Sequence, residues 1–185
     1  ASVIYDRIEP AADRLVFTTE IAGELRVARE PDGRLTLDFP ARPGRPVEAP
    51  AGLADALGAR PAEVLESGDN LLVVFEAADA VAALEPDFRG LARQDSHGVI
   101  TTASGRDGVD FVSRYFAPRV GIDEDPVTGS AHCTLTPYWA GRLGRTALEA
   151  RQISRRGGAL TCRLAGDRVL MTGAATLVLE GTLHV

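Results

Sequence analysis

The feature that most constrains the fold of this chain is an almost uncharged segment between Ala131 and Leu143. Its apolar residues, which include Leu135 and Trp139, point around a helix axis and do not lie on one narrow stripe. A helix of this kind needs apolar neighbours on several sides, so we expect strands to enclose it. Pro137 removes one backbone hydrogen bond, at a cost of ~3 kcal/mol in an isolated helix, so the helix must bend or be compensated.

Short segments of alternating apolar and polar residues surround this helix in the sequence. They predict a hairpin over residues 15–28 and strands over 34–41, 70–77, 97–104, 110–118, 159–165, 167–173 and 175–185. Short helices are expected at 51–59 and 79–84, and residues 59–67 are interpreted as an irregular turn or helix. This order predicts an α+β fold with a mostly antiparallel sheet rather than a βαβ repeat.

The composition argues against several classes of function. A net charge of -6 and a pI near 5.1 leave no broad basic face, so no nucleic-acid partner is expected. No apolar run approaches the roughly 20 residues that cross a bilayer, so we expect a cytoplasmic chain without a membrane partner. The histidines lack metal-ligand spacing, and Cys133 and Cys162 are expected to be reduced thiols, so no metal is predicted.

The segment DEDPVTGSAHC leads into the apolar helix. Asp-Pro favours an extended residue, Thr-Gly permits a tight turn, and Ser130 is expected to cap the helix. Unpaired N–H groups and the positive end of the helix dipole would stabilise a carboxylate or phosphate over Gly129, Ser130 and Ala131. The alternative is that TGS is only a turn and a cap, which is the commoner arrangement.

Other residues admit both a functional and a structural interpretation. His132 points to a different side of the helix from Ser130, which argues against a serine hydrolase, and it either packs or supports the site. Cys133 is expected in the core. The arginines and glycines of SRRGG, residues 154–158, form either an anion-binding loop or a solvated one. Nucleotide binding is disfavoured, because GxxxxGK[ST] and GxGxxG are both missing.

Several blocks of the sequence together resemble a known family. The phenazine-biosynthesis (PhzF-like) family, related by fold to diaminopimelate epimerase, contains the same blocks in the same order, namely DNLLVVFE, PDFRGLA, DFVSRYFAP, GIDEDPVTGSAHCTLTPYWAGRLGR and ARQISRRGGALTCRL. The resemblance covers nearly the whole chain. It implies a lobe in which a strongly curved, mostly antiparallel sheet wraps around a central helix, here the helix from about residue 130.

The resemblance also implies a function. Members act as cofactor-independent isomerases that shift a proton on a small carboxylated metabolite, with neither metal nor organic cofactor. Through the DPxTGS motif, the implied catalytic residue is Asp125 and the implied substrate-binding residues are Thr128, Gly129 and Ser130. Epimerases of this fold use a pair of cysteines, whereas this chain has Asp125 and Pro126 in the corresponding loop, so a two-thiol racemase is disfavoured.

One part of the family pattern is missing from these 185 residues. The family's first lobe supplies a glutamate that moves the proton and a Gly-His pair, and neither motif occurs here. We therefore expect residues 1–40 to be a remnant of that lobe with connecting strands, 41–173 the C-terminal lobe, and 174–185 a strand returning to the first lobe. The expected partner is a second copy in a homodimer or a missing N-terminal lobe. The alternative function is a non-catalytic anion-binding or remnant domain.

Overall fold

The computed structural model describes residues 1–20 and 23–182, and it confirms the predicted α+β class. The helices are α1 (Ser2–Arg7), α2 (Leu53–Leu57), α3 (Ala78–Ala82), α4 (Phe88–Ala92) and α5 (Gly129–Leu143), with a 3₁₀ turn at Pro118–Val120. The strands are β1 (Arg14–Thr19), β2 (Gly23–Arg29), β3 (Leu35–Pro40), β4 (Arg45–Pro46), β5 (Glu63–Ser67), β6 (Asn70–Val74), β7 (Gly98–Ser104), β8 (Phe111–Ala117), β9 (Ile122–Asp125), β10 (Ala147–Gln152), β11 (Gly158–Ala165) and β12 (Arg168–Gly173).

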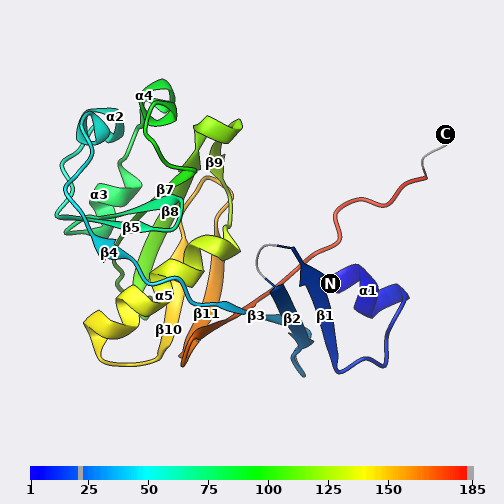
Figure 1. Ribbon diagram of the computed structural model, residues 1–185. Coiled ribbons are helices and arrows are strands. Elements are labelled where there is room, and N and C mark those ends of the chain that lie inside the picture. Colours follow the sequence, from blue (N-terminus) through cyan, green and yellow to red (C-terminus); the bar gives the residue numbers. More distant parts are fainter. Residues whose placement is uncertain (21–22, 183–185) are drawn as a thin grey trace.

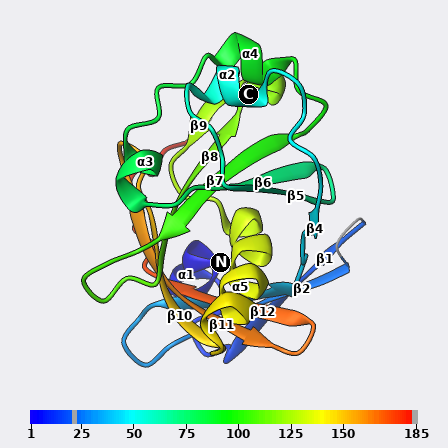
Figure 2. The same cartoon turned by 90° about the vertical axis from the view of Figure 1, so that its left-hand side faces the viewer.

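In the part of the chain that the structure describes, these strands belong to one sheet. Its order is β1-β2-β3-β12-β11-β10-β8-β7-β6-β5-β4, and β9 pairs with β8 outside that path. The pairs β6–β7 and β8–β10 are parallel and the others are antiparallel. The sheet bends around α5, with β5–β8 on one side of the helix and β10–β12 on the other (Figure 2). The prediction of a curved, mostly antiparallel sheet around a central helix is therefore confirmed.

The central helix α5 is buried as its residues predict. Leu135 is fully buried, Trp139 is 4% exposed, and the Trp139 ring stacks on Phe111 of β8 with centroids 5.9 Å apart. Core residues from β5–β8 and from β10–β12 contribute to the same apolar cluster. Because apolar neighbours surround α5, this helix needs no single apolar stripe.

Pro137 lies inside α5 without leaving a carbonyl unpaired. The carbonyl of Cys133, four residues earlier, accepts a hydrogen bond from the Arg42 N–H at 2.9 Å. Arg42 belongs to the proline-rich connector between β3 and β4. The connector therefore replaces the helical bond that a proline cannot make, and this contact fixes it against the helix.

Two smaller cores complete the molecule. On the outer face of β5–β8, helices α2, α3 and α4 cover a second apolar cluster (Figure 1). Strands β1–β3 extend the sheet beside the α5 lobe, and α1 packs on them (Figure 1). Tyr5 of α1 is fully buried, and its hydroxyl donates to the Val27 carbonyl at 2.6 Å. Because β3 pairs with both β2 and β12, the extension is continuous with the lobe.

Parts of the predicted secondary structure are wrong. Residues 174–182 form no strand, because they have no partner strand among the described residues and Val178 and Leu179 are exposed; residues 183–185 lie outside the described range. Residues 63–67 form strand β5 rather than a turn or helix, because Val64 and Leu65 enter two different cores. Strands β9 and β10 have no predicted counterpart. The domain boundaries at residues 40 and 173 stay predictions.

The described residues also bear on membranes, metals and thiols. None of their helices is long and apolar enough to cross a membrane. Within the same ranges, no three His, Cys, Asp or Glu side chains are grouped so that they could hold a metal ion. Cys133 and Cys162 are buried free thiols.

Candidate functional site

The loop between β9 and α5 carries all four residues that the sequence singles out. Asp125 ends β9, Thr128 is the extended residue that precedes the helix, and Gly129 and Ser130 begin its first turn. The expectation that Ser130 caps the helix is wrong. The helix begins one residue before Ser130, whose side chain is exposed, and the capping position belongs to Thr128.

The first turn of α5 has no side-chain cap. The Thr128 hydroxyl makes no bond to the helix and donates instead to the Asp125 carboxylate. The N–H groups of Gly129 and Ser130 have no acceptor within the helix, because the first N–H groups of any α-helix lack one. The positive end of the helix dipole adds to their potential. The start of α5 can therefore bind a small anion.

Asp125 lies half-buried beside Tyr115, its partner in the β8–β9 pair. Burial raises the pKa of the Tyr115 hydroxyl, and the negative charge of Asp125 raises it further. The same hydroxyl donates to Asn70 Oδ1 at 2.9 Å. Tyr115 is therefore a neutral neighbour that brings no positive charge to Asp125.

A buried glutamine from β10 braces this loop. Gln152 is fully buried, and its Oε1 accepts a hydrogen bond from the Thr128 N–H at 2.8 Å. Its Nε2 donates to the Asp125 carbonyl at 2.7 Å and to the Thr128 hydroxyl at 3.2 Å. One side chain thus holds both ends of the segment from Asp125 to Thr128.

The turn after β10 supports the same loop from outside. The Ser154 hydroxyl donates to the Pro126 carbonyl at 2.8 Å and accepts from the Gly157 N–H at 3.0 Å. A Cβ atom on Gly158 would lie 2.4 Å from Val127 Cγ2, so only glycine lets the loop come this close. The serine and glycines of SRRGG therefore have a packing role.

An apolar cavity opens beside the first turn of α5. It has a volume of about 510 Å³ and lies between the loop, the start of β3, the start of β11 and the end of β12. Its walls include Leu37, Met171 and Gly129, together with backbone at Gly158 and Gly173. A Cβ on Gly129 would meet nothing within 4 Å, so the space above this residue is open. A ligand in this cavity can reach the uncapped helix start.

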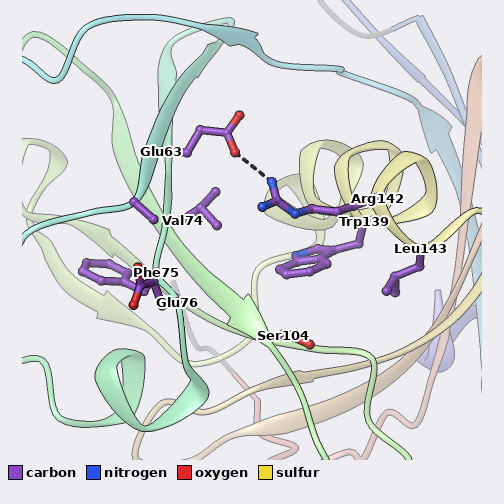
Figure 3. A pocket seen from close by; sticks show the side chains of 9 residues that line it. Glu63, Val74, Phe75, Glu76, Ser104, Trp139, Arg142 and Leu143 are labelled. Carbon is purple, nitrogen blue, oxygen red and sulfur yellow. Dashed lines mark hydrogen bonds and ion pairs between the residues drawn. The ribbon is translucent and has the colours of Figure 1, made fainter.

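A second cavity, of about 520 Å³, lies near the opposite end of α5 (Figure 3). Two of its charged side chains, Glu63 and Arg142, already pair with each other. Arg142 donates to Glu63 at 2.9 Å, and the Tyr138 hydroxyl donates to the same carboxylate at 2.8 Å. Burial and then the Glu63 carboxylate raise the pKa of Tyr138 to about 12. The Trp139 ring forms part of the wall (Figure 3).

Two further residues of α5 have structural roles. Cys133 is 3% exposed, as expected for a core thiol, and burial raises its pKa to about 11. His132 is fully buried, and burial lowers its pKa. His132 Nδ1 lies 2.8 Å from the Thr128 carbonyl, which can only accept, so Nδ1 carries the hydrogen. His132 is thus a hydrogen-bonded packing residue that also supports Thr128.

Other charged residues near the loop have different positions. Glu124 forms an ion pair with Arg114 at 2.7 Å, and Arg114 also donates to the Leu84 carbonyl at 2.7 Å. Glu124 therefore ties β9 to β8 and to the segment after α3. Arg155 and Arg156 are exposed and make no ion pair within residues 1–20 and 23–182.

Sequence reasoning missed Gln152 although a signal was present. Residues 147–152 alternate between exposed and buried positions, with Leu148, Ala150 and Gln152 inward. A glutamine that continues an inward-facing apolar series is a buried polar group, and such groups need partners. The partners themselves lie 24 to 27 residues away in the chain.

Comparisons with known proteins agree with this architecture. A family model described as phenazine biosynthesis-like protein matches residues 4–181. Over its full length, the chain is 51% identical to an uncharacterized isomerase of Pseudomonas aeruginosa, of which it covers 70%. It is also 37% identical to a phenazine biosynthesis-like domain-containing protein of Homo sapiens, with 99% of this chain and 69% of that protein aligned.

Solved structures show the same likeness in three dimensions. A PhzF-family phenazine biosynthesis protein from Enterococcus faecalis superposes with a TM-score of 0.91 at 40% identity. A putative phenazine biosynthesis PhzC/PhzF protein from Clostridium difficile superposes with a TM-score of 0.88 at 34% identity. These alignments cover 99% and 100% of this chain and 69% and 70% of the two solved chains.

Proposed function

Because the chain belongs to the phenazine biosynthesis-like family, we propose that it acts in a cofactor-independent isomerisation, a proton shift on a small carboxylated metabolite. Two similar proteins are named isomerases, which supports this class of reaction at the level of the family. We assign Asp125 as the catalytic carboxylate and Thr128, Gly129 and Ser130 as the substrate-binding group. The expected ligand is a small carboxylate.

One observation carries the proposal. The side chain that could cap α5, the Thr128 hydroxyl, is turned to Asp125, so the N–H groups of Gly129 and Ser130 are left for a ligand. A carboxylate at these groups gains from the helix dipole about 0.3–1 kcal/mol when exposed, and more when it is partly buried. The cavity beside Gly129 gives that carboxylate a place for its apolar body.

The same arrangement suits the chemistry of a proton shift. When a proton leaves carbon conjugated with a carboxylate, negative charge moves onto the carboxylate oxygens. N–H groups that already point at those oxygens stabilise this charge without reorganising. The start of α5 would therefore bind the transition state better than the ground state, which is the condition for catalysis.

The carboxylate that we assign as the base is Asp125, which accepts a hydrogen bond from the Thr128 hydroxyl beside the proposed anion site. A base must come within about 3 Å of the carbon-bound hydrogen that it removes. The proton must also be returned at a second carbon. The resemblance to the family implies that a glutamate of the first lobe moves the proton, and that motif does not occur in these 185 residues. We therefore propose that this chain alone binds substrate and turns it over slowly or not at all, and that a second copy or an N-terminal lobe completes the site.

Solvent deuterium exchange tests this proposal. The substrate is a dihydro-hydroxyanthranilate-like acid, and the proteins are this chain, the same chain joined to a family N-terminal lobe, and Asp125→Ala in each. We expect exchange near background for the chain alone, fast exchange with the added lobe, and loss of that exchange in Asp125→Ala. Asp123→Ala, which changes an exposed carboxylate two residues away, is the matched control and should exchange normally.

Two other results would change the assignment. Rapid exchange by this chain that survives Asp125→Ala would exclude Asp125 as the catalytic residue. Binding of the acid without exchange in any of the proteins would favour the second candidate, a non-catalytic anion-binding domain. The uncapped start of α5 supports either function, since binding an anion does not require a base.

A further inference from the structure

We infer that Gln152 is a positioning residue that fixes the start of α5 and directs the Thr128 hydroxyl toward Asp125. Gln152 lies outside the DPVTGS motif, at the end of β10, and its side chain contacts the loop between β9 and α5. The inference deepens the proposed function and rests on it where it concerns ligand binding. The hydrogen bonds that carry it can be tested without any ligand.

The orientation of the Gln152 amide is set by its two backbone partners. The Thr128 N–H can only donate, so it must meet Oε1, which lies 2.8 Å away. The Asp125 carbonyl can only accept, so it must meet Nε2 at 2.7 Å. Exchanging the amide nitrogen and oxygen would break both bonds, so the partners alone fix the orientation.

The direction of the Thr128 hydroxyl follows from the orientation of the Gln152 amide. Gln152 Nε2 has a second hydrogen, and Thr128 Oγ1 lies 3.2 Å from this nitrogen. Because the hydroxyl oxygen accepts that hydrogen, the hydroxyl's own hydrogen can be donated to the Asp125 carboxylate, to which the hydroxyl is hydrogen-bonded. The chain of donors therefore runs from Gln152 through Thr128 to Asp125. Such a chain orients the carboxylate and keeps the Thr128 hydroxyl from capping α5.

The strand that carries Gln152 is held between two neighbouring strands. Strand β10 pairs in parallel with β8, where Gln152 lies opposite Ser113, and antiparallel with β11, where it lies opposite Gly158. The next residue, Ile153, donates its N–H to the Ser113 carbonyl at 2.8 Å. A side chain held between two strands positions a loop better than a residue within the loop could.

Loss of these hydrogen bonds would displace the backbone groups that bind the ligand. Without Gln152, the Thr128 N–H, on a residue that is 8% exposed, would lose its acceptor and the loop would have to move to find another. Gly129 and Ser130 follow directly, so their N–H groups would move with it. Because displacements of about 1 Å at a binding group can cost 10²-fold in function, a positioning residue has a measurable effect.

The experiment compares Gln152→Met with Gln94→Met in this chain. Gln94 is also buried, at 7% exposure, and makes one side-chain bond of 3.3 Å to the Ala51 carbonyl, far from the loop in the sequence. Both variants replace a buried amide by a thioether of similar length. The readouts are amide hydrogen exchange at Thr128 and titration with sodium sulfate, followed at the amide signals of Gly129 and Ser130.

In wild type, we expect the Thr128 amide to be protected and sulfate to shift the Gly129 and Ser130 signals. Gln152→Met should speed exchange at Thr128 by at least 100-fold and weaken sulfate binding by at least tenfold, while Gln94→Met changes neither. Unchanged Thr128 exchange in Gln152→Met, or equal losses in both variants, would overturn the inference. If sulfate does not bind to wild type, the proposed anion site is overturned. Amide hydrogen exchange at Thr128 would still decide the role of Gln152.

A pair of variants at Thr128 tests the donor chain even if Gln152→Met does not fold. Thr128→Ser keeps the hydroxyl and should retain sulfate binding within threefold. Thr128→Val keeps the shape but has no hydroxyl, so it should weaken binding by at least tenfold. If Thr128→Val binds sulfate as well as Thr128→Ser does, the hydroxyl has no positioning role and the donor chain is wrong.

Discussion

The two ends of the central helix α5 differ in what their polar groups bind. Each end adjoins a cavity, of about 510 Å³ at the N-terminal end and about 520 Å³ at the C-terminal end. At the C-terminal end, Glu63, Tyr138 and Arg142 satisfy one another. At the N-terminal end, Asp125, Thr128 and Gln152 hold the loop and leave the first helical N–H groups without a side-chain cap.

This difference indicates that cavity volume alone does not mark a binding site. A ligand near Arg142 would have to compete with the Glu63 carboxylate, which already pairs with the Arg142 guanidinium. A ligand near Gly129 would instead satisfy donors that the fold leaves open. We therefore assign a structural role to the C-terminal end of α5 and a binding role to the N-terminal end.

The largest expected effect comes from the C-terminal half of the helix. Trp139→Ala removes a buried ring that stacks on Phe111 and donates to the Thr102 hydroxyl at 3.0 Å. It should lower the free energy of unfolding by about 3–5 kcal/mol, measured by urea denaturation. Sulfate affinity of the remaining folded protein should not change. A loss below about 1 kcal/mol would contradict the structural role of this end.

A smaller effect is expected at Gly158, which packs against the loop between β9 and α5. Gly158→Ala places a Cβ 2.4 Å from Val127 Cγ2, and the stiff, branched side chain of Val127 cannot easily move away. The loop must shift, so stability should fall by about 1–3 kcal/mol and sulfate should bind several-fold more weakly. Calorimetric titration alongside urea denaturation measures both changes. Unaltered sulfate affinity in the folded variant would show that the turn after β10 does not position the loop.

Acid should lower the free energy of unfolding through His132, which lies near the N-terminal end of α5. Burial lowers the pKa of His132 below its ordinary value of 6.5, while the bond to the Thr128 carbonyl opposes this shift. As pH falls below 6.5, the unfolded chain gains a proton at His132 that the folded chain does not, so stability falls. The slope is at most about 1.4 kcal/mol per pH unit.

Urea denaturation at several pH values between roughly 7 and 5 covers the range in which an ordinary histidine titrates. Comparing the pH dependence of stability in wild type and in variants isolates the contribution of His132. His132→Gln should flatten the dependence, even if it lowers stability at pH 7. His97→Gln, at an exposed position, is the matched control variant. Equal slopes for wild type and His132→Gln would exclude His132 as the source.

The smallest change in stability is expected for alanine variants of two glycines in α5. Comparing these variants separates an effect on sulfate binding from an effect on folding. Gly129 and Gly141 lie near opposite ends of α5, and an added Cβ meets nothing within 4 Å at either position. Alanine favours the helix over glycine by roughly 0.5–1 kcal/mol in helix interiors, so both variants should be neutral or slightly stabilised. Only Gly129→Ala should weaken sulfate binding, because its methyl group enters the space where the anion lies. Equal affinity in the two variants would place the anion elsewhere.

The sequence predicted those parts of the molecule that depend on neighbouring residues. The enclosed helix followed from the distribution of Leu135, Trp139 and their neighbours around one axis. The anion site over Gly129, Ser130 and Ala131 stays a prediction. The strands near residues 98–104 and 111–117 followed from alternation. In each case the information lay within a few residues.

The sequence could not predict what depends on partners far along the chain. The parallel pairing of β10 with β8, which brings Gln152 to the loop, has no local signature. The choice of Asp125 rather than the first turn as the partner of the Thr128 hydroxyl also depends on Gln152. For the same reason, the apolar run at 175–185 was predicted as a strand, although residues 174–182 pair with no strand among the described residues.

A crystal structure of this chain with benzoate tests most directly the claim that the N-terminal end of α5 is the binding end. Benzoate combines a carboxylate with an apolar ring, as the proposed ligand does. We expect its carboxylate at about 3 Å from the backbone nitrogens of Gly129 and Ser130, and its ring in the cavity against Leu37 and Met171. Benzoate bound beside Arg142 in the opposite cavity, with none at Gly129, would contradict the claim.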